Sequence, residues 1–237
     1  GRLTSVIFLG GCNARCPFCQ NHELWDEGDS GDVARMVSWG QIREDLRRRR
    51  NWLDGVVISG GEPVMHPELP ELCRAVKKLG FALKLDTNGT FPYALMRLCD
   101  MKLVDYVALD IKTALDERYS KACGREIEPG LVRRTLQFLL GSGLGFELRT
   151  TLVPGLVGPA EIDAIAQEIR AASELTANKL SKYALQQFVP DNAWSEDLRR
   201  IKPYDRAAAE QFAARLESVA GKVVLRGKFE PIKPGAS

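Results

Sequence analysis

Three cysteines and a histidine lie close together near the start of the chain, in the segment GGCNARCPFCQNH at positions 10–22. Cys12, Cys16 and Cys19 follow the spacing C-x3-C-x2-C, and His22 comes three residues after the last cysteine. Thiolates on one short loop are typical ligands of zinc or of an iron–sulfur cluster. With His22 as a fourth ligand the loop could hold a tetrahedral zinc ion, whereas a [4Fe–4S] cluster on three cysteines would keep one iron free of protein ligands. The spacing alone leaves both interpretations open.

Four more polar motifs come directly after short apolar runs. These are SGGEP at 59–63, DTNG at 86–89, DIK at 110–112 and RTTLVPG at 149–155. Taken singly, Gly, Asn, Pro and Asp at such places are ordinary loop formers. Because the carboxyl ends of parallel strands meet at one edge of a sheet, we expect the four motifs and the cysteine loop to form one site.

The elements that must position these motifs alternate between strand-like and helix-like sequence. Strands are predicted at 4–9, 55–59, 81–86, 104–111, 146–153, 182–188 and 222–226, and helices at 38–53, 66–80, 91–98, 131–140, 159–175 and 204–219. The alternation indicates βαβ crossovers and a parallel sheet covered by helices, as an open sheet or as a complete or partial barrel. We expect one α/β domain over 1–237, with a C-terminal helix, strand and tail at 195–237.

Composition excludes several classes of protein. The 237 residues are 45% hydrophobic and 27% charged with a formal net charge of +2, which is typical of a soluble protein and not of a nucleic-acid binder. No apolar run approaches the roughly 18 to 20 residues of a membrane span, so we expect a cytoplasmic protein without a membrane partner. The motifs GxSxG, GxxxxGK followed by Ser or Thr, and HExxH are absent. The sequence therefore does not support a serine hydrolase, a P-loop nucleotide hydrolase or a zinc protease.

The motifs occur in an order that resembles one enzyme family. GCNARCPFCQN, SGGEP, LDTNGT, VDYVALDIK and LRTTLVPGL, spread over positions 4–188, are similar to the motifs of radical S-adenosylmethionine (SAM) enzymes, and within them to the glycyl-radical-enzyme activating enzymes. The pattern is most like the longer activating proteins of anaerobic ribonucleoside-triphosphate reductase. The resemblance implies a partial (β/α)6-type TIM barrel that binds a [4Fe–4S] cluster and SAM.

The same resemblance implies a reaction and two protein partners. An electron from a donor such as flavodoxin or ferredoxin would reduce the cluster and cleave SAM to a 5′-deoxyadenosyl radical. That radical would take a hydrogen atom from a glycine of a partner glycyl radical enzyme, expected to be anaerobic ribonucleotide reductase. The cofactor would thus carry the difficult step, and the protein would contribute positioning and exclusion of water.

Roles follow from the resemblance position by position. Cys12, Cys16 and Cys19 are expected to bind the cluster, and Phe18 to lie against the SAM adenine. Gly60, Gly61 and Glu62 are expected to contact the ammonium group of SAM. Asp86, Thr87 and Asp110 are expected to hold a monovalent cation beside SAM. Lys112 and Arg149 are expected to lie near the carboxylate of SAM.

Two departures from the family leave the adenine contacts and the substrate open. Gln20 stands where a histidine is common, and LQQFVPDN at 185–192 lacks the histidine that lies near adenine in a relative. A radical SAM enzyme that acts on a small molecule, as the 7-carboxy-7-deazaguanine synthases do, is therefore a second interpretation. A non-catalytic zinc-binding module completed by His22 is a third.

Some charged residues have plain structural alternatives. Arg149 could form an ion pair with Asp110 or Glu147, and Lys112 could be solvated at a strand end. The four arginines at 47–50 favour a solvated helix face over an acidic docking patch. His66 is expected to cap or pack within a loop, and Cys73 and Cys99 to be small hydrophobic residues of the core.

Overall fold

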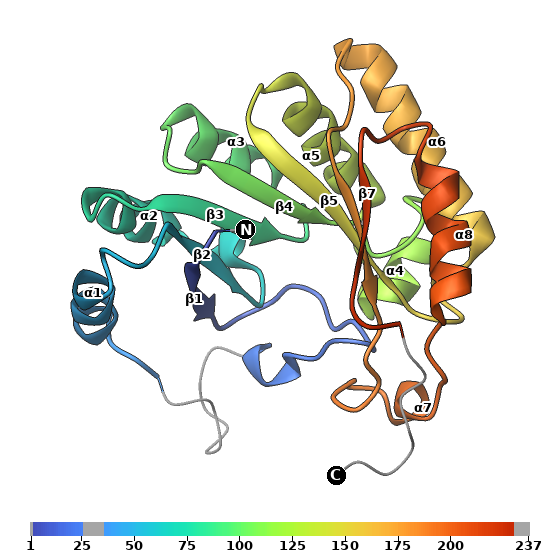
Figure 1. Ribbon diagram of the computed structural model, residues 1–237, viewed down its shortest axis with the longest axis horizontal. Coiled ribbons are helices and arrows are strands. Elements are labelled where there is room, and N and C mark those ends of the chain that lie inside the picture. Colours follow the sequence, from blue (N-terminus) through green and yellow to red (C-terminus); the bar gives the residue numbers. More distant parts are fainter. Residues whose placement is uncertain (1, 26–35, 230–237) are drawn as a thin grey trace.

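The computed structural model describes residues 2–25 and 36–229, and its centre is a seven-stranded parallel sheet (Figure 1). The strands lie in the order of the sequence: β1 (Thr4–Leu9), β2 (Gly55–Gly60), β3 (Ala82–Thr87), β4 (Tyr106–Asp110), β5 (Gly145–Leu152), β6 (Tyr183–Gln187) and β7 (Val223–Arg226). β1 and β7 are the two ends of this order and do not pair with each other, so the sheet is open.

The seven strands confirm the predicted α/β architecture and the partial barrel. Each strand-like run of the sequence forms a strand whose ends lie within two residues of the prediction. β7, which is also among the predicted strands, adds a seventh strand to the (β/α)6-type arrangement that the resemblance implies. The predicted C-terminal tail from 230 onward lies outside the described residues, and the single-domain prediction stays a prediction.

Helices connect successive strands and lie along the outer side of the sheet in Figure 1. They are α1 (Trp39–Arg48), α2 (Leu69–Lys78), α3 (Pro92–Asp100), α4 (Arg118–Cys123), α5 (Pro129–Gly141), α6 (Pro159–Thr176), α7 (Glu196–Arg199) and α8 (Arg206–Leu216), with 3-10 turns η1 (His22–Leu24) and η2 (Pro63–Met65). Their starts follow local chemistry. Ser38 forms a capping box with Gln41 at α1, and the Asp205 carboxylate accepts from the Ala208 N–H at α8.

Four short elements escaped prediction, namely α4, α7, η1 and η2. None is longer than six residues, so none shows a helical period of hydrophobic residues. Two of them, α4 and η1, make backbone contacts with the cysteine loop, which is why their positions bear on the site.

Alternation along the strands gives the sheet two different faces. Ile58, Leu85 and Leu148 are fully buried on the face that the helices cover. The neighbouring positions turn to the inner face, where the register pairs Asp110 with Arg149.

One hydrophobic cluster extends from Ile7 to Phe229 and includes Cys73, with Cys99 packed against it, as expected. Within residues 2–25 and 36–229, no helix combines the length and the hydrophobicity of a membrane span.

Candidate active site

The cysteine loop, residues 10–22, leaves the end of β1 and is closed by its own backbone. Gly11 N donates to Leu24 O at 2.7 Å, and Cys12 N donates to Trp25 O at 3.1 Å. Within the loop, Cys19 N donates to Cys16 O at 2.9 Å, which forms a tight turn between the second and third cysteines. The loop is thus a fixed structure at the carboxyl end of β1.

Three distant segments hold this loop from outside. Arg15 N donates to Cys123 O at 2.7 Å at the end of α4, and Ser195 N donates to Pro17 O at 2.8 Å just before α7. The Gln20 side chain donates to Val189 O at 3.0 Å, after β6. Because these partners lie more than a hundred residues further along the chain, the position of the thiols depends on the completed fold.

Gly60 and Gly61 let the end of β2 approach the cysteine loop closely. A Cβ atom at Gly61 would lie 1.9 Å from the Gly11 carbonyl oxygen, and Gly60 has a φ of +130°. Glu62 N then donates to Gly11 O at 2.8 Å. A side chain at either glycine would push the two loops apart, so the chain packing itself requires glycine here.

Glu62, which is expected to contact the SAM ammonium, makes several hydrogen bonds within the protein. Its carboxylate is fully buried and accepts hydrogen bonds from Thr87 Oγ1 at 2.7 Å, Asn88 N at 2.6 Å and Val64 N at 3.1 Å. Burial raises the pKa of this carboxyl to about 7, and the three donors oppose that rise. Glu62 does not line the cavity described below, and its hydrogen bonds fix the loop after β3; its expected contact with the SAM ammonium stays a prediction.

A bridge of side-chain amides joins the cysteine loop to the end of β3, and sequence reasoning missed it. Asn88 Nδ2 donates to Asn13 Oδ1 at 2.9 Å, and Asn13 Nδ2 donates to Thr90 Oγ1 at 2.9 Å. The only signal was that Asn13 lies within CNARC and that Asn88 and Thr90 lie within DTNGT. Nothing in those motifs showed that they face each other.

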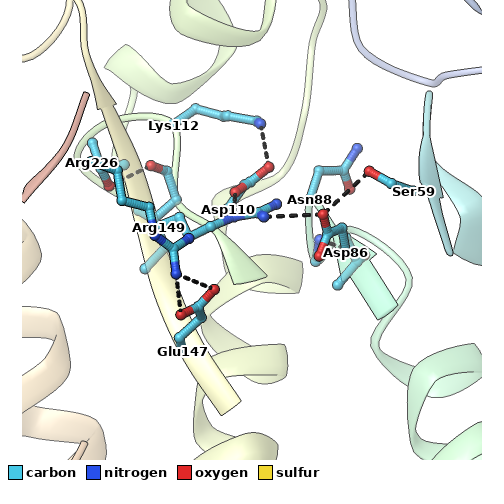
Figure 2. A network of polar contacts seen from close by, with 12 residues as sticks. Ser59, Asp86, Asn88, Asp110, Lys112, Glu147, Arg149 and Arg226 are labelled. Carbon is cyan, nitrogen blue, oxygen red and sulfur yellow. Dashed lines mark hydrogen bonds and ion pairs between the residues drawn. The ribbon is translucent and has the colours of Figure 1, made fainter. Parts of the chain in front are cut away.

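An ion network crosses the inner face of the sheet at its carboxyl end (Figure 2). Arg149 contacts two carboxylates, with Nε 2.6 Å from Asp110 Oδ1 and a terminal nitrogen 3.0 Å from Asp86 Oδ2. Lys112 Nζ lies 3.2 Å from Asp110 Oδ2, and Ser59 Oγ donates to Asp86 Oδ2 at 3.2 Å. These five side chains come from the ends of β2, β3, β4 and β5, and they confirm that these strand-end motifs meet.

The charged groups of the network shift one another's pKa values. Burial disfavours charge on Asp110, but the Arg149 and Lys112 cations outweigh that cost and hold the pKa of the carboxyl well below its usual value. In return, Asp110 raises the pKa of Lys112, and Asp110 with Asp86 raises that of Arg149, both against the effect of burial. Lys84 Nζ also lies 3.4 Å from Asp86 Oδ1, so three cations face the two carboxylates.

The arrangement bears on two expectations. The Arg149 guanidinium bridges Asp86 and Asp110, and the expected monovalent cation beside SAM at these carboxylates stays a prediction. Of the two ion pairs considered for Arg149, the structure has the one with Asp110. Glu147, two residues before Arg149 on β5, is paired with Arg226 (Figure 2). It is also paired with Lys84 and Lys182.

A cavity of about 260 Å³ lies between the cysteine loop and the ion network. Every predicted site residue except Glu62 lines it: Cys12, Cys16, Phe18, Cys19, Gly60, Gly61, Asp86, Thr87, Asp110, Lys112 and Arg149. Lining residues that the sequence did not reveal are Trp25, Ser59, Asn88, Thr151, Gln186, Gln187 and Phe188. Gln186 and Gln187 end β6 and Phe188 follows it, in the segment LQQFVPDN that lacks the histidine expected from a relative.

Lys112 lines the same cavity as the three thiols. Burial raises the pKa of Cys12 to about 11 and also raises that of Cys19, whereas contact with the Cys123 thiol, and then burial, raises that of Cys16. The Lys112 cation acts in the opposite direction on all three and favours their thiolates. The positive charge of Lys112 would therefore compensate the negative charge of a metal group bound by these three thiolates.

The donor set fits an iron–sulfur cluster better than a zinc ion. Among the described residues, no group of three or more His, Cys, Asp or Glu side chains is arranged around one point as ligands of a single ion. Zinc would need thiolate sulfurs at about 2.3 Å from one centre, whereas a cluster spreads its thiolates over different irons. His22 packs on the ring of Trp194 at 5.2 Å and does not line the cavity.

Comparison with known proteins assigns the family. The model of the radical SAM superfamily matches residues 6–169. A protein of Methanocaldococcus jannaschii that its name places among the glycyl-radical enzyme activating enzymes is 30% identical over 97% of this chain and 92% of its own length. The chain belongs to the radical SAM superfamily. Radical SAM enzymes use a [4Fe–4S] cluster and SAM, so these are the cofactors of this enzyme.

Two further comparisons bear on substrate and fold. A 7-carboxy-7-deazaguanine synthase of Synechocystis is 35% identical, but over 36% of this chain and 38% of its own length. The crystal structure of Streptococcus suis SuiB bound to the precursor peptide SuiA superposes on 95% of this chain with a TM-score of 0.69 at 14% identity. This radical SAM chain spans about half of SuiB, 49% of its length, and the likeness supports the fold.

Proposed function

We propose that this radical SAM enzyme is an activase that installs a glycyl radical on a partner enzyme. The observation that carries the proposal is that a loop with three thiols and a network of paired charges line one cavity at the carboxyl ends of an open sheet. The activating-enzyme relative matches almost the whole chain, whereas the small-molecule relative matches about a third of it. The partner proposed from the sequence motifs is anaerobic ribonucleotide reductase.

Cys12, Cys16 and Cys19 are the proposed cluster ligands, with Lys112 balancing the charge of the thiolates. When bound, the cluster and SAM supply an electron and an organic radical that takes a hydrogen atom from the substrate. The protein must then hold SAM and keep water away from the radical. The depth of Cys16, which is 7% exposed, and the bond from the adjacent Arg15 N to Cys123 O at the end of α4 favour that exclusion.

The remaining cavity wall suits the parts of SAM. The backbone at Gly60 and Gly61 faces the cavity next to the thiols and is open to the ammonium group. Lys112 and Arg149 are proposed to bind the SAM carboxylate, sharing their charges between it and the two carboxylates. Phe18 and Phe188 provide apolar ring surfaces for adenine. Glu62 acts indirectly, because it fixes Thr87 and the Asn88 backbone.

The open edge of the sheet supports a macromolecular substrate. β1 is an end strand, and its Val6 and Phe8 are 45% and 54% exposed although Ile7 between them is buried. The register pairs Phe8 with Ser59, so both apolar side chains turn to the face that carries the cavity. Exposed apolar side chains beside an unpaired strand edge are typical of a surface that receives an extended peptide.

The test is anaerobic incubation of the cluster-loaded enzyme with SAM, dithionite and anaerobic ribonucleotide reductase. A glycine-centred doublet should appear on the reductase in electron paramagnetic resonance, with 5′-deoxyadenosine formed in step. A panel of other glycyl radical enzymes provides the comparison. If none of them yields the doublet while a purine precursor stimulates 5′-deoxyadenosine formation, the enzyme acts on a small molecule and the proposal is wrong.

A further inference from the structure

Three polar side chains between the cysteine loop and the end of β3 form a closed ring of hydrogen bonds. Asn88 Nδ2 donates to Asn13 Oδ1 at 2.9 Å, and Asn13 Nδ2 donates to Thr90 Oγ1 at 2.9 Å. Thr90 Oγ1 in turn donates to Asn88 Oδ1 at 2.7 Å, which closes the ring. Asn13 lies between Cys12 and Cys16 on the cysteine loop, whereas Asn88 and Thr90 follow β3. We call these three residues the polar triad.

One backbone hydrogen bond fixes the orientation of both amides. The Thr90 N–H, which can only donate, lies 3.0 Å from Asn88 Oδ1, so the oxygen of the Asn88 amide must point to Thr90. The Asn88 nitrogen then points to Asn13, which must present its own oxygen there and its nitrogen to Thr90. No other assignment of the amide atoms satisfies all four bonds, so each amide has a single orientation.

The two members of the polar triad after β3 are shielded from water. Asn88 is 8% exposed and Thr90 is 5% exposed. A buried polar group is costly to leave unpaired, and hydrogen bonds that share atoms in one network strengthen each other. Removal of one member therefore weakens the bonds of the other two, and we expect the three side chains to act as a unit.

A second connection joins the same two segments through Glu62. Glu62 N donates to Gly11 O at 2.8 Å on the cysteine loop, and the Glu62 carboxylate accepts from Asn88 N at 2.6 Å. Asn88 is thus held to the cysteine loop by its backbone through Glu62 and by its side chain through Asn13. Two attachment points restrict the rotation of one segment against the other, which a single hydrogen bond would allow.

The polar triad lies between two parts of the cavity wall. Cys12 and Cys16, on either side of Asn13 in the sequence, line the cavity, and so do Asn88 and its neighbour Thr87. The thiol part is the proposed cluster site, and the β3 part belongs to the proposed SAM site. A misplacement of about 1 Å between reacting groups can cost a hundredfold in rate, so the separation of these two parts has to be fixed.

We propose that Asn13, Asn88 and Thr90 are positioning residues that hold the cluster-binding loop and the SAM-binding end of β3 at a fixed separation. The inference rests on the proposed function, in which the three thiols bind the cluster and this end of β3 contacts SAM. The polar triad acts through the two parts of the wall that it joins. Its loss should therefore weaken SAM binding to the cluster-loaded enzyme without removing a cluster ligand.

The experiment measures the SAM affinity of the cluster-loaded enzyme by anaerobic calorimetry. Thr90→Val keeps the shape of the side chain but removes the hydroxyl, and Asn13→Ala removes the link on the cysteine loop. Each should weaken SAM binding about tenfold, as expected for the net loss of one or two hydrogen bonds. Thr90→Ser, which keeps the hydroxyl, should bind SAM like the parent. The change that SAM causes in the electron paramagnetic resonance of the reduced cluster should need correspondingly more SAM in the two weakened variants.

A double-mutant cycle tests whether the ring acts as a unit. The double variant Asn13→Ala/Thr90→Val should also bind SAM about tenfold more weakly than the parent, because either single change already opens the ring. Independent contributions would instead multiply to about a hundredfold. Thr176→Val is the control, since it removes a hydroxyl that donates to Ala172 O at 2.9 Å on α6 and does not line the cavity. Its SAM affinity should equal that of the parent.

Iron content separates positioning from damage to the cluster site. The variants of the polar triad keep all three thiols, so they should load iron as the parent does. Unchanged SAM affinity in Asn13→Ala and Thr90→Val, or multiplied losses in the double variant, would overturn the proposal. Equal weakening in Thr176→Val, or a loss of iron as complete as that in Cys16→Ala, would also overturn it.

These results can be told apart from the outcome for the activase, because no partner enzyme takes part in the measurements. If every candidate partner fails to acquire a radical while the variants lose SAM affinity as expected, the activase proposal fails and the role of the polar triad stands. If the variants bind SAM like the parent while a partner acquires its radical, the polar triad is not a positioning device and the activase proposal stands.

Discussion

Arg149 Nε donates to Asp110 Oδ1 at 2.6 Å, and the two residues are register partners on the neighbouring strands β5 and β4. The pairing of the strands therefore sets the ion pair, because side chains of register partners turn to the same face. The Arg149 side chain is 11% exposed and also reaches Asp86. One guanidinium thus connects the ends of three strands at the floor of the cavity.

Replacement of Asp110 by Asn should destabilise the protein and weaken SAM binding. The change leaves the Arg149 and Lys112 cations without their shared partner, and breaking such a buried pair costs about 3 kcal/mol. The free energy of unfolding in urea and the SAM affinity by calorimetry measure the two effects. Glu71→Gln, which breaks the exposed Arg74–Glu71 pair, is the matched control and should cost less than about 1 kcal/mol. Equal losses in both variants would contradict the assignment.

Replacement of Cys12, Cys16 or Cys19 by Ala should each abolish cluster binding, whereas His22→Ala should not. The three thiols line the cavity, and the His22 ring instead packs on Trp194 and Trp25. Iron content and visible absorbance after anaerobic reconstitution give the answer. Stoichiometric zinc without iron uptake in protein purified under nitrogen would restore the zinc-module interpretation.

Gly61→Ala should disrupt the site although it adds one methyl group. The new Cβ would lie 1.9 Å from the Gly11 carbonyl oxygen, so the cysteine loop must move away from β2. We expect reduced iron loading and a lower free energy of unfolding by about 1 to 3 kcal/mol, as for overpacking elsewhere. Gly40→Ala, within α1 and with no Cβ contact shorter than 3.8 Å, is the control and should be neutral or stabilising. Full iron loading in Gly61→Ala would show that the two loops are not tightly coupled.

Glu62 should make stability depend on pH in the direction opposite to an ordinary ion-paired carboxylate. Its pKa rises from the usual 4.5 to about 7 in the folded protein, so between these values the folded state holds the proton more tightly than the unfolded state. The free energy of unfolding should therefore fall as pH rises from 4.5 to 7, by about 3 kcal/mol at 1.36 kcal/mol per pKa unit.

Glu62→Gln isolates this titration because it keeps the shape of the side chain. Urea unfolding of the parent and the variant between pH 4.5 and 8 measures the difference in their slopes. The variant should lack the decline that the parent shows through this window. Parallel pH profiles of the two proteins would mean that the Glu62 pKa is not raised by burial.

The amino-acid sequence by itself determined the architecture and most of the cavity wall. Hydrophobic residues repeat every two residues in strands and about every 3.6 residues in helices, and both patterns can be read from neighbouring residues alone. The seven strands could therefore be predicted. Parallel strands must place their carboxyl ends at one edge, so the spacing of Cys12, Cys16 and Cys19 and the motifs at Asp86, Asp110 and Arg149 were enough to bring them together.

Only the tertiary structure decided where individual side chains point at that edge. Glu62 turns inward to Thr87 and Asn88, and Arg149 bridges Asp86 and Asp110. The contacts of Trp194 with the cysteine loop join segments about 170 residues apart. Such contacts are set by packing and hydrogen bonding between segments that meet after folding, and no local period or spacing records them.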